Sequence, residues 1–285
     1  MSLETILNEC HLNIARYEPV QGGDINRSFC LFGDDGKYFL KVNDANRHPG
    51  MFEKEATGLR ALNVNGPIKV PIVIQAGISD REQYLLMEWI ETGKPKKDFW
   101  ETFGAGLAQL HKKEQHYFGW EADNYVGSLI QHNQSFKDWP RFFAECRIIP
   151  LVKRLFDAGD IADQDVVAAE AICKKLDQLF PSEPPSLLHG DLWNGNFMSS
   201  LNGEPVLFDP AVYNGHREMD LGMTKLFGGF DARFYDAYRE VYPLENRWEQ
   251  RLPVTELYPL LVHAILFGGY YVERIRDTLK IALTI

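Results

Sequence analysis

The sequence predicts an α+β protein of two lobes, a small β-rich N-terminal lobe over residues 1–91 and a larger, mainly helical C-terminal lobe over residues 92–285. Two observations predict this division. Apolar runs with strand composition gather before residue 91, whereas apolar residues at helical spacing dominate after it. The length of 285 residues is also about twice the ~150 residues typical of one domain.

The first predicted element is a β-hairpin over residues 28–42. Two β-leaning runs, SFCLF and KYFLKV, are joined by the turn-forming residues GDDG. Directly upstream lies QGGDIN, a loop with two adjacent glycines, Gly22 and Gly23. Adjacent glycines let backbone N–H groups approach a phosphate closely, so they are candidates for a turn that covers ATP. A plain turn before the hairpin is the alternative.

An amphipathic helix is predicted from Met51 onward. Its apolar residues recur at helical spacing, and the sequence NGP at 65–67 ends it; they are Phe52, Ala56, Leu59 and Leu62. Two apolar runs, VPIVIQAG and QYLLMEWI, follow and are predicted to be strands. The polar segment ETGKPKK at 91–97, with its Gly and Pro, then marks the boundary between the lobes.

The second lobe is predicted to be helical with one compact interruption. A stripe of apolar residues from Phe99 to Leu110 indicates a first helix, and residues 141–157 and 162–180 indicate two more. The interruption consists of short strands that carry polar residues at their ends, SLLHGDLWNGNFM and PVLFDP. Helical spacing resumes at Leu221.

Composition excludes several classes of protein. Forty acidic against thirty basic residues give a net charge of −10, which disfavours nucleic acid and anionic membranes as partners. The N-terminus lacks the basic and apolar regions of a signal peptide. The most apolar stretch, residues 257–272, is too short to span a bilayer and is expected to be a buried helix. Four scattered cysteines suggest no zinc site or disulfide framework, so a cytoplasmic protein is expected.

One group of polar residues has a spacing that indicates a catalytic site. HGDLWNGN places His189, Asp191 and Asn196 in one loop, and FDP places Asp209 after the next strand. Asn196 follows Asp191 by five residues, and Asp209 follows Asn196 by thirteen. This arrangement resembles protein kinases, in the HGDxxxxN form found in kinases of small molecules. The resemblance implies that Asp191 accepts the proton of the substrate hydroxyl, while Asn196 and Asp209 hold the Mg²⁺ that bridges the phosphates of ATP.

A kinase also needs a strand lysine held by a helix glutamate against the nucleotide phosphates. Lys41 in YFLKV meets the first requirement. Glu55 is the preferred partner because it lies next to the apolar Ala56, and Glu53 remains open. Exposed, solvated side chains are the alternative for both members of this pair.

The strand LLMEWI ends just before the predicted boundary, where the chain of a kinase presents backbone groups to adenine. Its candidates, by position alone, are Met87, Glu88 and Trp89. Their side chains could equally belong to the core.

Several longer stretches resemble the fructosamine kinase (ketosamine kinase) family: QGGDIN, MFEKEATGL, FGWEADNYVGS, HGDLWNGN and FDPAVYNGHREMDLGM followed by LFGGF. They cover residues 21–230, most of the chain. The resemblance implies a bilobal protein-kinase-like fold and ATP-dependent phosphorylation of a sugar hydroxyl, expected at the 3-position, on a small-molecule ketosamine or a glycated lysine. It further implies that Asp220 is a buried carboxylate that supports the catalytic loop together with His189.

Three more residues are candidates for substrate binding. Trp193 stands where protein kinases usually carry a lysine, and its face could lie against a sugar ring; a core tryptophan that props the loop is the alternative. His216 and Arg217 could approach the phosphates or the substrate, with an ion-paired surface cluster as an equal alternative.

Two rival functions remain. Other small-molecule kinases, acting on aminoglycosides, choline or homoserine, share the HGD loop, whereas FDPAVYNGHREMDL favours ketosamines. A nucleotide-binding pseudokinase is disfavoured because the chain keeps every residue of the proposed kinase site: Lys41, Glu55, Asp191, Asn196 and Asp209. A module that only binds nucleotide does not need a proton acceptor such as Asp191. The residues indicate neither the sugar of the adduct nor the oligomeric state.

Overall fold

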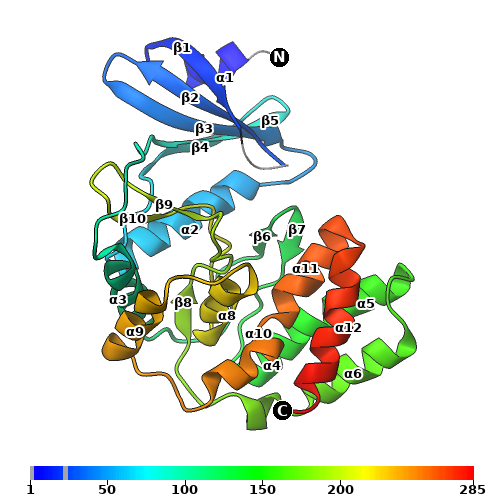
Figure 1. The fold of residues 1–285 in the computed structure, drawn as a ribbon. Coiled ribbons are helices and arrows are strands. Elements are labelled where there is room, and N and C mark those ends of the chain that lie inside the picture. The colour runs from blue at the N-terminus through cyan, green and yellow to red at the C-terminus, as the bar shows by residue number, and fades with distance from the viewer. Residues whose placement is uncertain (1–2, 22–24) are drawn as a thin grey trace. The chain divides into compact units, whose positions relative to one another are not determined.

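A five-stranded antiparallel sheet forms the framework of the N-terminal part of the chain (Figure 1). It is seen in a computed structural model that describes residues 3–21 and 25–285. The strand order is β1-β2-β3-β5-β4. The strands are β1 (Ile14–Val20), β2 (Arg27–Gly33), β3 (Gly36–Asp44), β4 (Val73–Ser79) and β5 (Glu82–Glu88).

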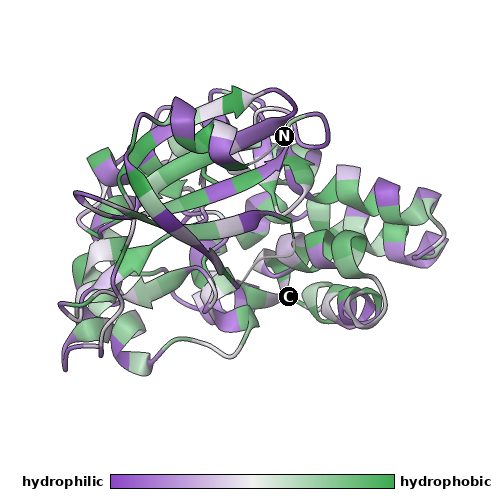
Figure 2. Cartoon of the chain, turned by 90° about the horizontal axis from the view of Figure 1, so that it is seen from above, coloured by the Kyte–Doolittle hydropathy of each residue, from purple (hydrophilic) through white to green (hydrophobic). Residues whose placement is uncertain are grey.

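The hairpin predicted over residues 28–42 is confirmed as β2 and β3, with Gly33 paired to Gly36 across the turn. The sequence analysis did not anticipate β1, because most of its side chains are exposed and it lacks an apolar face. One face of the sheet buries Leu31, Leu40 and Leu86 against the short helix α1 (Leu3–Glu9). Hydrophobic and hydrophilic residues are interspersed along the strands in Figure 2.

The predicted amphipathic helix is α2 (Met51–Asn65), which packs against β4 and β5. All four residues of its predicted apolar stripe are buried, so this prediction is confirmed. The helix ends where expected: the N–H of Gly66 donates to the carbonyl of Leu62 at 2.8 Å, and Pro67 follows. Proline restricts the preceding residue to an extended conformation and so disfavours another helical turn.

Contacts between residues divide the chain into two compact units, and each unit is built from two separate stretches of the sequence. The first contains the residues up to Phe99 together with 197–210, and the second contains 100–196 and 211–285. The hairpin of β9 (Phe197–Ser199) and β10 (Pro205–Leu207) joins the first unit through bridges from Lys69 to Val206 and from Thr92 to Ser200. The domain boundary predicted at residues 91–92 stays a prediction.

The second unit is mainly helical (Figure 1). The stripe predicted from Phe99 to Leu110 is buried along α3, as expected. Its helices are α3 (Phe99–His111), α4 (Trp139–Phe143), α5 (Ile149–Asp157), α6 (Asp163–Cys173), α7 (Leu176–Leu179), α8 (Glu218–Leu226), α9 (Ala232–Val241), α10 (Leu252–Thr255), α11 (Leu257–Phe267) and α12 (Tyr270–Ala282), with a π turn at Ala144–Ile148 and a 3₁₀ turn at Trp248–Arg251.

Two helix predictions need correction. Residues 162–180 form two helices, α6 and α7, interrupted at Lys174. Residues 257–272 are not one buried helix either. Gly268 and Gly269 adopt positive φ angles of 64° and 52°, which end α11 and allow α12 to begin in a new direction. In the described ranges, 3–21 and 25–285, no helix has the length and apolar character needed to cross a membrane.

Short strands hold the HGDLWNGN loop in the second unit. β8 (Ser186–Leu188) leads into the loop and pairs with β11 (Tyr213–Gly215), which precedes α8. A second small hairpin, β6 (Asn124–Val126) with β7 (Leu129–Gln131), lies in the same unit. The Asn124 amide donates to the Val212 carbonyl at 2.7 Å, which ties this hairpin to the segment before β11.

Candidate active site

In the first unit, Lys41 lies between two carboxylates. Its Nζ is 2.7 Å from Oε1 of Glu55 and also contacts Oδ1 of Asp209. Of the two glutamates that the sequence left open, Glu55 is therefore the one that contacts Lys41, while Glu53 is exposed. Burial alone lowers the pKa of Lys41, but the two carboxylates outweigh it and raise that pKa above its usual value. The lysine is thus a fixed cation.

Asp209 has an unusual backbone. Its φ of 53° is left-handed, although proline follows it and favours an extended conformation at the preceding residue. Strained residues of this kind cluster at functional sites. The side chain remains 44% exposed while Oδ1 contacts Lys41, so a carboxylate oxygen is within reach of a ligand. A carboxylate of this kind fits a hard cation such as Mg²⁺.

In the second unit, Asn196 holds Asp191. The Asn196 Nδ2 donates at 2.8 Å both to Oδ2 of Asp191 and to its backbone carbonyl. Because both partners are acceptors, they fix the amide orientation, and Oδ1 is its remaining acceptor oxygen. That oxygen is also of the type that Mg²⁺ prefers. The loop therefore orients a carboxylate and a neutral oxygen donor together.

Asp220 supports this loop from α8. Its Oδ2 accepts the backbone N–H of His189 at 2.8 Å, and its Oδ1 accepts that of Gly190 at 2.9 Å. The ring of His111, at the end of α3, lies 3.2 Å from the same carboxylate. Burial alone raises the pKa of Asp220, but these hydrogen bonds and the nearby histidines outweigh it, so its pKa is below the usual value. Asp220 is therefore an ionised acceptor.

Gly190 meets a strict conformational requirement beside Asp191. Its φ is 83°, and a Cβ at this position would lie 2.0 Å from the carbonyl oxygen of Ala211. Only glycine fits both conditions without a backbone shift. This requirement explains a glycine at the position that is arginine in the HRD loop of protein kinases.

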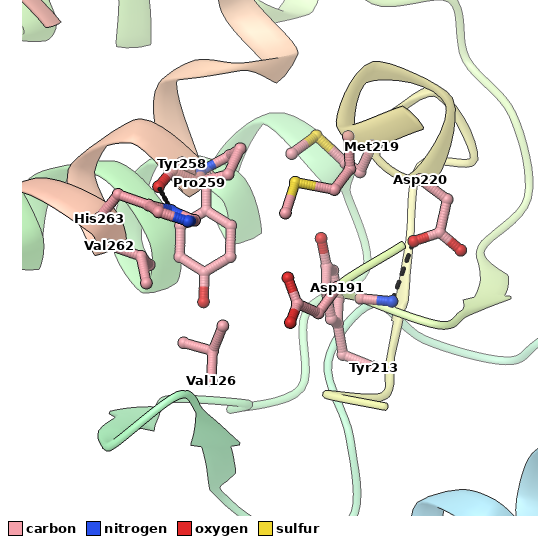
Figure 3. Close-up of a pocket in the computed structure, with 11 residues that line it drawn as sticks. Val126, Asp191, Tyr213, Met219, Asp220, Tyr258, Pro259, Val262 and His263 are labelled. Carbon is pink, nitrogen blue, oxygen red and sulfur yellow. Dashed lines mark hydrogen bonds between the residues drawn. The ribbon is translucent and has the colours of Figure 1, made fainter. Parts of the chain in front are cut away.

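A pocket opens in front of Asp191 within the second unit (Figure 3). The Asp191 carboxylate points toward α11, which contributes Tyr258, Val262 and His263 to the opposite wall. Met219 lines the pocket from α8, and the remaining lining residues are Val126, Gly190, Tyr213, Asp220, Met223 and Pro259. A carboxylate that faces a largely apolar pocket is a suitable acceptor for the proton of a substrate hydroxyl.

Trp193 lies at the surface of the HGDLWNGN loop. Its side chain is 37% exposed, which is more than expected of a core tryptophan. The indole crosses the backbone at Gly195, where a Cβ would lie 2.4 Å from the ring, and packs edge-on against Phe227 at 5.7 Å. The exposed part of the ring is available to a ligand.

His216 and Arg217 are buried in a cluster of charges. The guanidinium of Arg217 donates to both oxygens of Glu183 at 2.6 and 2.7 Å and covers the ring of Tyr242 at 3.6 Å. His216 lies between aromatic rings, with Phe180 at 5.0 Å. These contacts favour the ion-paired alternative for Arg217, although the cluster is buried and not on the surface.

The remaining sequence candidates lie in the first unit. Gly22 and Gly23 fall outside the described residues. Met87 is buried in the core, and Glu88 forms an ion pair with Lys69 at 2.6 Å. Trp89 follows the end of β5 and packs against Phe39 at 6.1 Å.

Comparisons with known proteins give the family. The model of the family described as fructosamine kinase matches residues 4–284. The chain belongs to the fructosamine kinase family. A relative from Synechocystis, named a probable ketoamine kinase, is 41% identical over 95% of this chain and 92% of its own. The crystal structure of a fructosamine-3-kinase candidate from Thermobifida fusca is 37% identical, with a TM-score of 0.90 over 100% of this chain and 99% of its own.

Membership in the fructosamine kinase family makes the protein a kinase, an ATP-dependent phosphotransferase. The resemblance noted in the sequence and the predicted protein-kinase-like fold are both confirmed. An aminoglycoside phosphotransferase in complex with ADP and hygromycin B shares the fold, with a TM-score of 0.67 over 99% of each chain. Because it is only 14% identical, this likeness concerns the fold alone.

For this fructosamine kinase family member, the sequence analysis missed several residues of the pocket. Tyr258 and His263 come from α11, and Met219 and Met223 from α8, so no short motif joins them to Asp191. His111 was missed as well, since it ends a helix whose apolar stripe was its only signal. The unusual stretch GHREMDLGM was noted, but its methionines were read only as part of a family motif.

Proposed function

We propose that this kinase transfers the γ-phosphoryl group of ATP to a sugar hydroxyl, expected at the 3-position, of a ketosamine such as fructosyl- or ribulosyl-lysine. The observation that carries the proposal is the oriented carboxylate of Asp191 at the wall of a pocket that belongs to a fructosamine kinase family member. The family supplies the substrate class, and the loop geometry supports the chemistry.

Asp191 acts on the acceptor. The hydroxyl oxygen forms a bond to the γ-phosphorus while the bond from that phosphorus to the bridging oxygen of ADP breaks, and the hydroxyl proton passes to the Asp191 carboxylate. Asn196 fixes the side chain by its hydrogen bond to Oδ2. Asp220 fixes the loop backbone on which Asp191 stands. The acceptor is thereby positioned before the reaction begins.

Lys41 acts on the nucleotide. Its Nζ, oriented by Glu55, contacts the phosphates, and backbone groups at Met87–Trp89 contact adenine. Gly22 and Gly23 cover the phosphates through backbone N–H groups. Asn196 and Asp209 are the residues that would hold Mg²⁺, which neutralises the charge of the phosphates when it is bound. The exposed left-handed Asp209 and the oriented amide of Asn196 supply hard oxygen donors for it.

Trp193 contacts the sugar. Its exposed indole face offers an apolar surface next to the catalytic carboxylate, and sugar rings have apolar faces that pack on such surfaces. His216 and Arg217 were candidates for the same task. Their burial and the ion pair of Arg217 with Glu183 favour a structural role for both, in which they support the segment before α8.

Release of ADP by the purified protein with Mg-ATP tests the proposal. The acceptors to compare are ribulosyl-lysine, fructosyl-lysine, choline, homoserine and an aminoglycoside. Turnover confined to the ketosamines is the expected result, and their relative kcat/KM values rank the sugars. Turnover on another acceptor alone would refute the substrate class, while nucleotide binding without any turnover would favour a pseudokinase.

A further inference from the structure

A row of aromatic side chains leads away from the catalytic loop within the second unit. It begins at Trp193, passes through Phe227 and His263, and reaches the start of α12. Neighbouring ring centroids lie 5.0–6.1 Å apart, within the range of favourable aromatic contacts. We call this row the aromatic shelf; its members are Trp193, Phe227, His263, Phe267, Tyr270 and Tyr271.

The inner end of the shelf is continuous with the pocket of Asp191. His263 lines that pocket and belongs to the shelf as well. Phe227 is tied to the catalytic loop twice: its ring contacts Trp193, and its carbonyl accepts a hydrogen bond from the Asn194 amide at 3.2 Å. The shelf is therefore fixed relative to the residue that acts on the substrate hydroxyl.

The outer end of the shelf is open to solvent. Phe267 is 58% exposed and Tyr270 is 63% exposed. Both flank the break between α11 and α12, where Gly268 and Gly269 adopt positive φ angles. The Phe267 ring packs at 5.6 Å against His263, which lines the pocket, and the Tyr270 hydroxyl accepts a hydrogen bond from Arg274 at 3.1 Å. Exposed apolar surface beside a pocket is a candidate ligand surface.

The charge of the site suits one part of the substrate. A ketosamine carries a secondary amine, which is protonated at neutral pH, close to the sugar carbons that react. Among the described residues that line the Asp191 pocket there is neither lysine nor arginine, and the carboxylates Asp191 and Asp220 are the charged groups. Aromatic faces and a carboxylate both attract an ammonium group.

The state of His263 agrees with a cationic ligand. Its Nδ1 lies 2.7 Å from the carbonyl of Pro259, so Nδ1 carries the proton and Nε2 is an acceptor in the neutral ring. Burial lowers the pKa of His263 below its usual value, although the bond to Pro259 opposes this change. The ring is neutral at pH 7 and does not repel an ammonium group.

From these observations we infer that the aromatic shelf is the subsite for the amine substituent of the ketosamine. The sugar lies at Asp191, the protonated amine lies at the inner rings, and the carbon chain beyond the amine packs on Phe267 and Tyr270. The preferred substrates are therefore adducts of amines with an extended chain, such as the side chain of lysine, and not adducts of methylamine. This inference rests on the proposed ketosamine kinase activity.

Two substrates with the same sugar test the inference: ribulose adducts of methylamine and of n-hexylamine. The hexyl chain reaches the outer shelf and the methyl group does not. For the unaltered enzyme we expect kcat/KM for the hexyl adduct to exceed that for the methyl adduct by about tenfold, mainly through KM, since apolar contact remote from the reacting atoms stabilises ground and transition states alike.

The double variant Phe267→Ser, Tyr270→Ser removes the outer shelf. We expect it to lower the ratio of the two kcat/KM values about three- to tenfold while turnover of the methyl adduct stays within about twofold. Phe156→Ser is the matched control, because Phe156 on α5 is 41% exposed and lies outside the shelf. Thermal unfolding of each variant confirms that it is folded.

The outcomes separate the two proposals. If the unaltered enzyme does not distinguish the chains, or if the shelf variant and Phe156→Ser give the same ratio as the unaltered enzyme, the shelf is not the amine subsite even though the enzyme phosphorylates ketosamines. If neither ribulose adduct nor fructosyl-lysine is phosphorylated, the ketosamine kinase proposal fails and the inference fails with it.

Discussion

The carboxylate of Asp220 accepts the backbone N–H of Gly190, the residue directly before Asp191, at 2.9 Å. The backbone N–H of His189 donates a second hydrogen bond to the same carboxylate, so Asp220 binds the loop at two consecutive residues. Asp220 lies in the first turn of α8, near the N-terminus of that helix, where the helix dipole also stabilises a negative charge. The orientation of Asp191 therefore depends on a carboxylate from a different element, the helix α8.

The variant Asp220→Asn tests this dependence. An amide cannot accept two backbone N–H groups with both of its terminal atoms, so one bond is lost and the loop shifts. We expect kcat to fall about 10- to 100-fold while KM for ATP changes less than about threefold, because small displacements of a catalytic group reduce turnover strongly. Steady-state kinetics measure both. Asp236→Asn, at an exposed position that pairs with Arg239, is the control and should leave both constants unchanged.

Asp191→Asn removes the proposed proton acceptor and little else. The amide oxygen can still accept the hydrogen bond from Asn196, so the loop should keep its shape. We expect kcat to fall at least about a thousandfold, with the dissociation constant for ATP within about threefold of the original value. Calorimetry gives the affinity and single-turnover assays give the rate. Full activity in this variant would contradict the assignment.

Lys41→Met tests the cation of the first unit. The variant leaves Glu55, whose side chain is 12% exposed, without its lysine and removes the proposed phosphate contact. We expect KM for ATP to rise about tenfold or more, together with a loss of kcat. Lys37→Met is a matched control on the same strand, because Lys37 is exposed and pairs there with Glu91. Equal effects of the two substitutions would show that the charge acts at long range and not by contact.

Asp209→Asn should change the response to metal. Nucleotide affinity in the presence of Mg²⁺ is expected to drop about tenfold, while affinity measured in a chelator stays nearly unchanged, since a neutral amide is a poorer ligand for a hard cation. Titration of ATP at several Mg²⁺ concentrations makes the comparison. An unaltered Mg²⁺ requirement would count against a metal ligand at this position.

Stability should fall as the pH drops from 7.5 to 5.5, in part because of His216. Burial lowers the pKa of this histidine in the folded protein, so between that value and the usual value near 6.5 the unfolded chain binds more protons. The contribution is therefore intact above pH ~6.5 and is lost as the pH falls below it, by at most about 1.4 kcal/mol per pH unit.

The variant His216→Gln removes this titration. Urea unfolding at pH 5.5 and 7.5 should show a difference in the free energy of unfolding that is smaller in the variant than in the original protein. The comparison between the two pH values cancels any constant loss of stability caused by the substitution itself. A pH dependence that is identical in both proteins would show that another group dominates.

Local patterns were sufficient for much of the fold. The spacing of Phe52, Ala56, Leu59 and Leu62 predicted α2, and the turn GDDG predicted the hairpin of β2 and β3, because both elements arise from residues close together in the chain. Predictions failed where the signal was weak. β1 has mostly exposed side chains and is defined by its hydrogen bonds to β2, and the break between α11 and α12 depends on the conformation of two glycines.

The sequence by itself determined the HGDLWNGN loop as the candidate site, because Asp191 and Asn196 are five positions apart and contact each other within that loop. The preference for Glu55 over Glu53 as the partner of Lys41 also came from the sequence, and the structure shows that contact. Only the tertiary structure decided that Arg217 pairs with Glu183 and that residues of α11 line the pocket opposite Asp191. It also decided that His263 connects this pocket wall to the aromatic shelf. These contacts join residues of separate helices, and their distances depend on how the whole second unit packs.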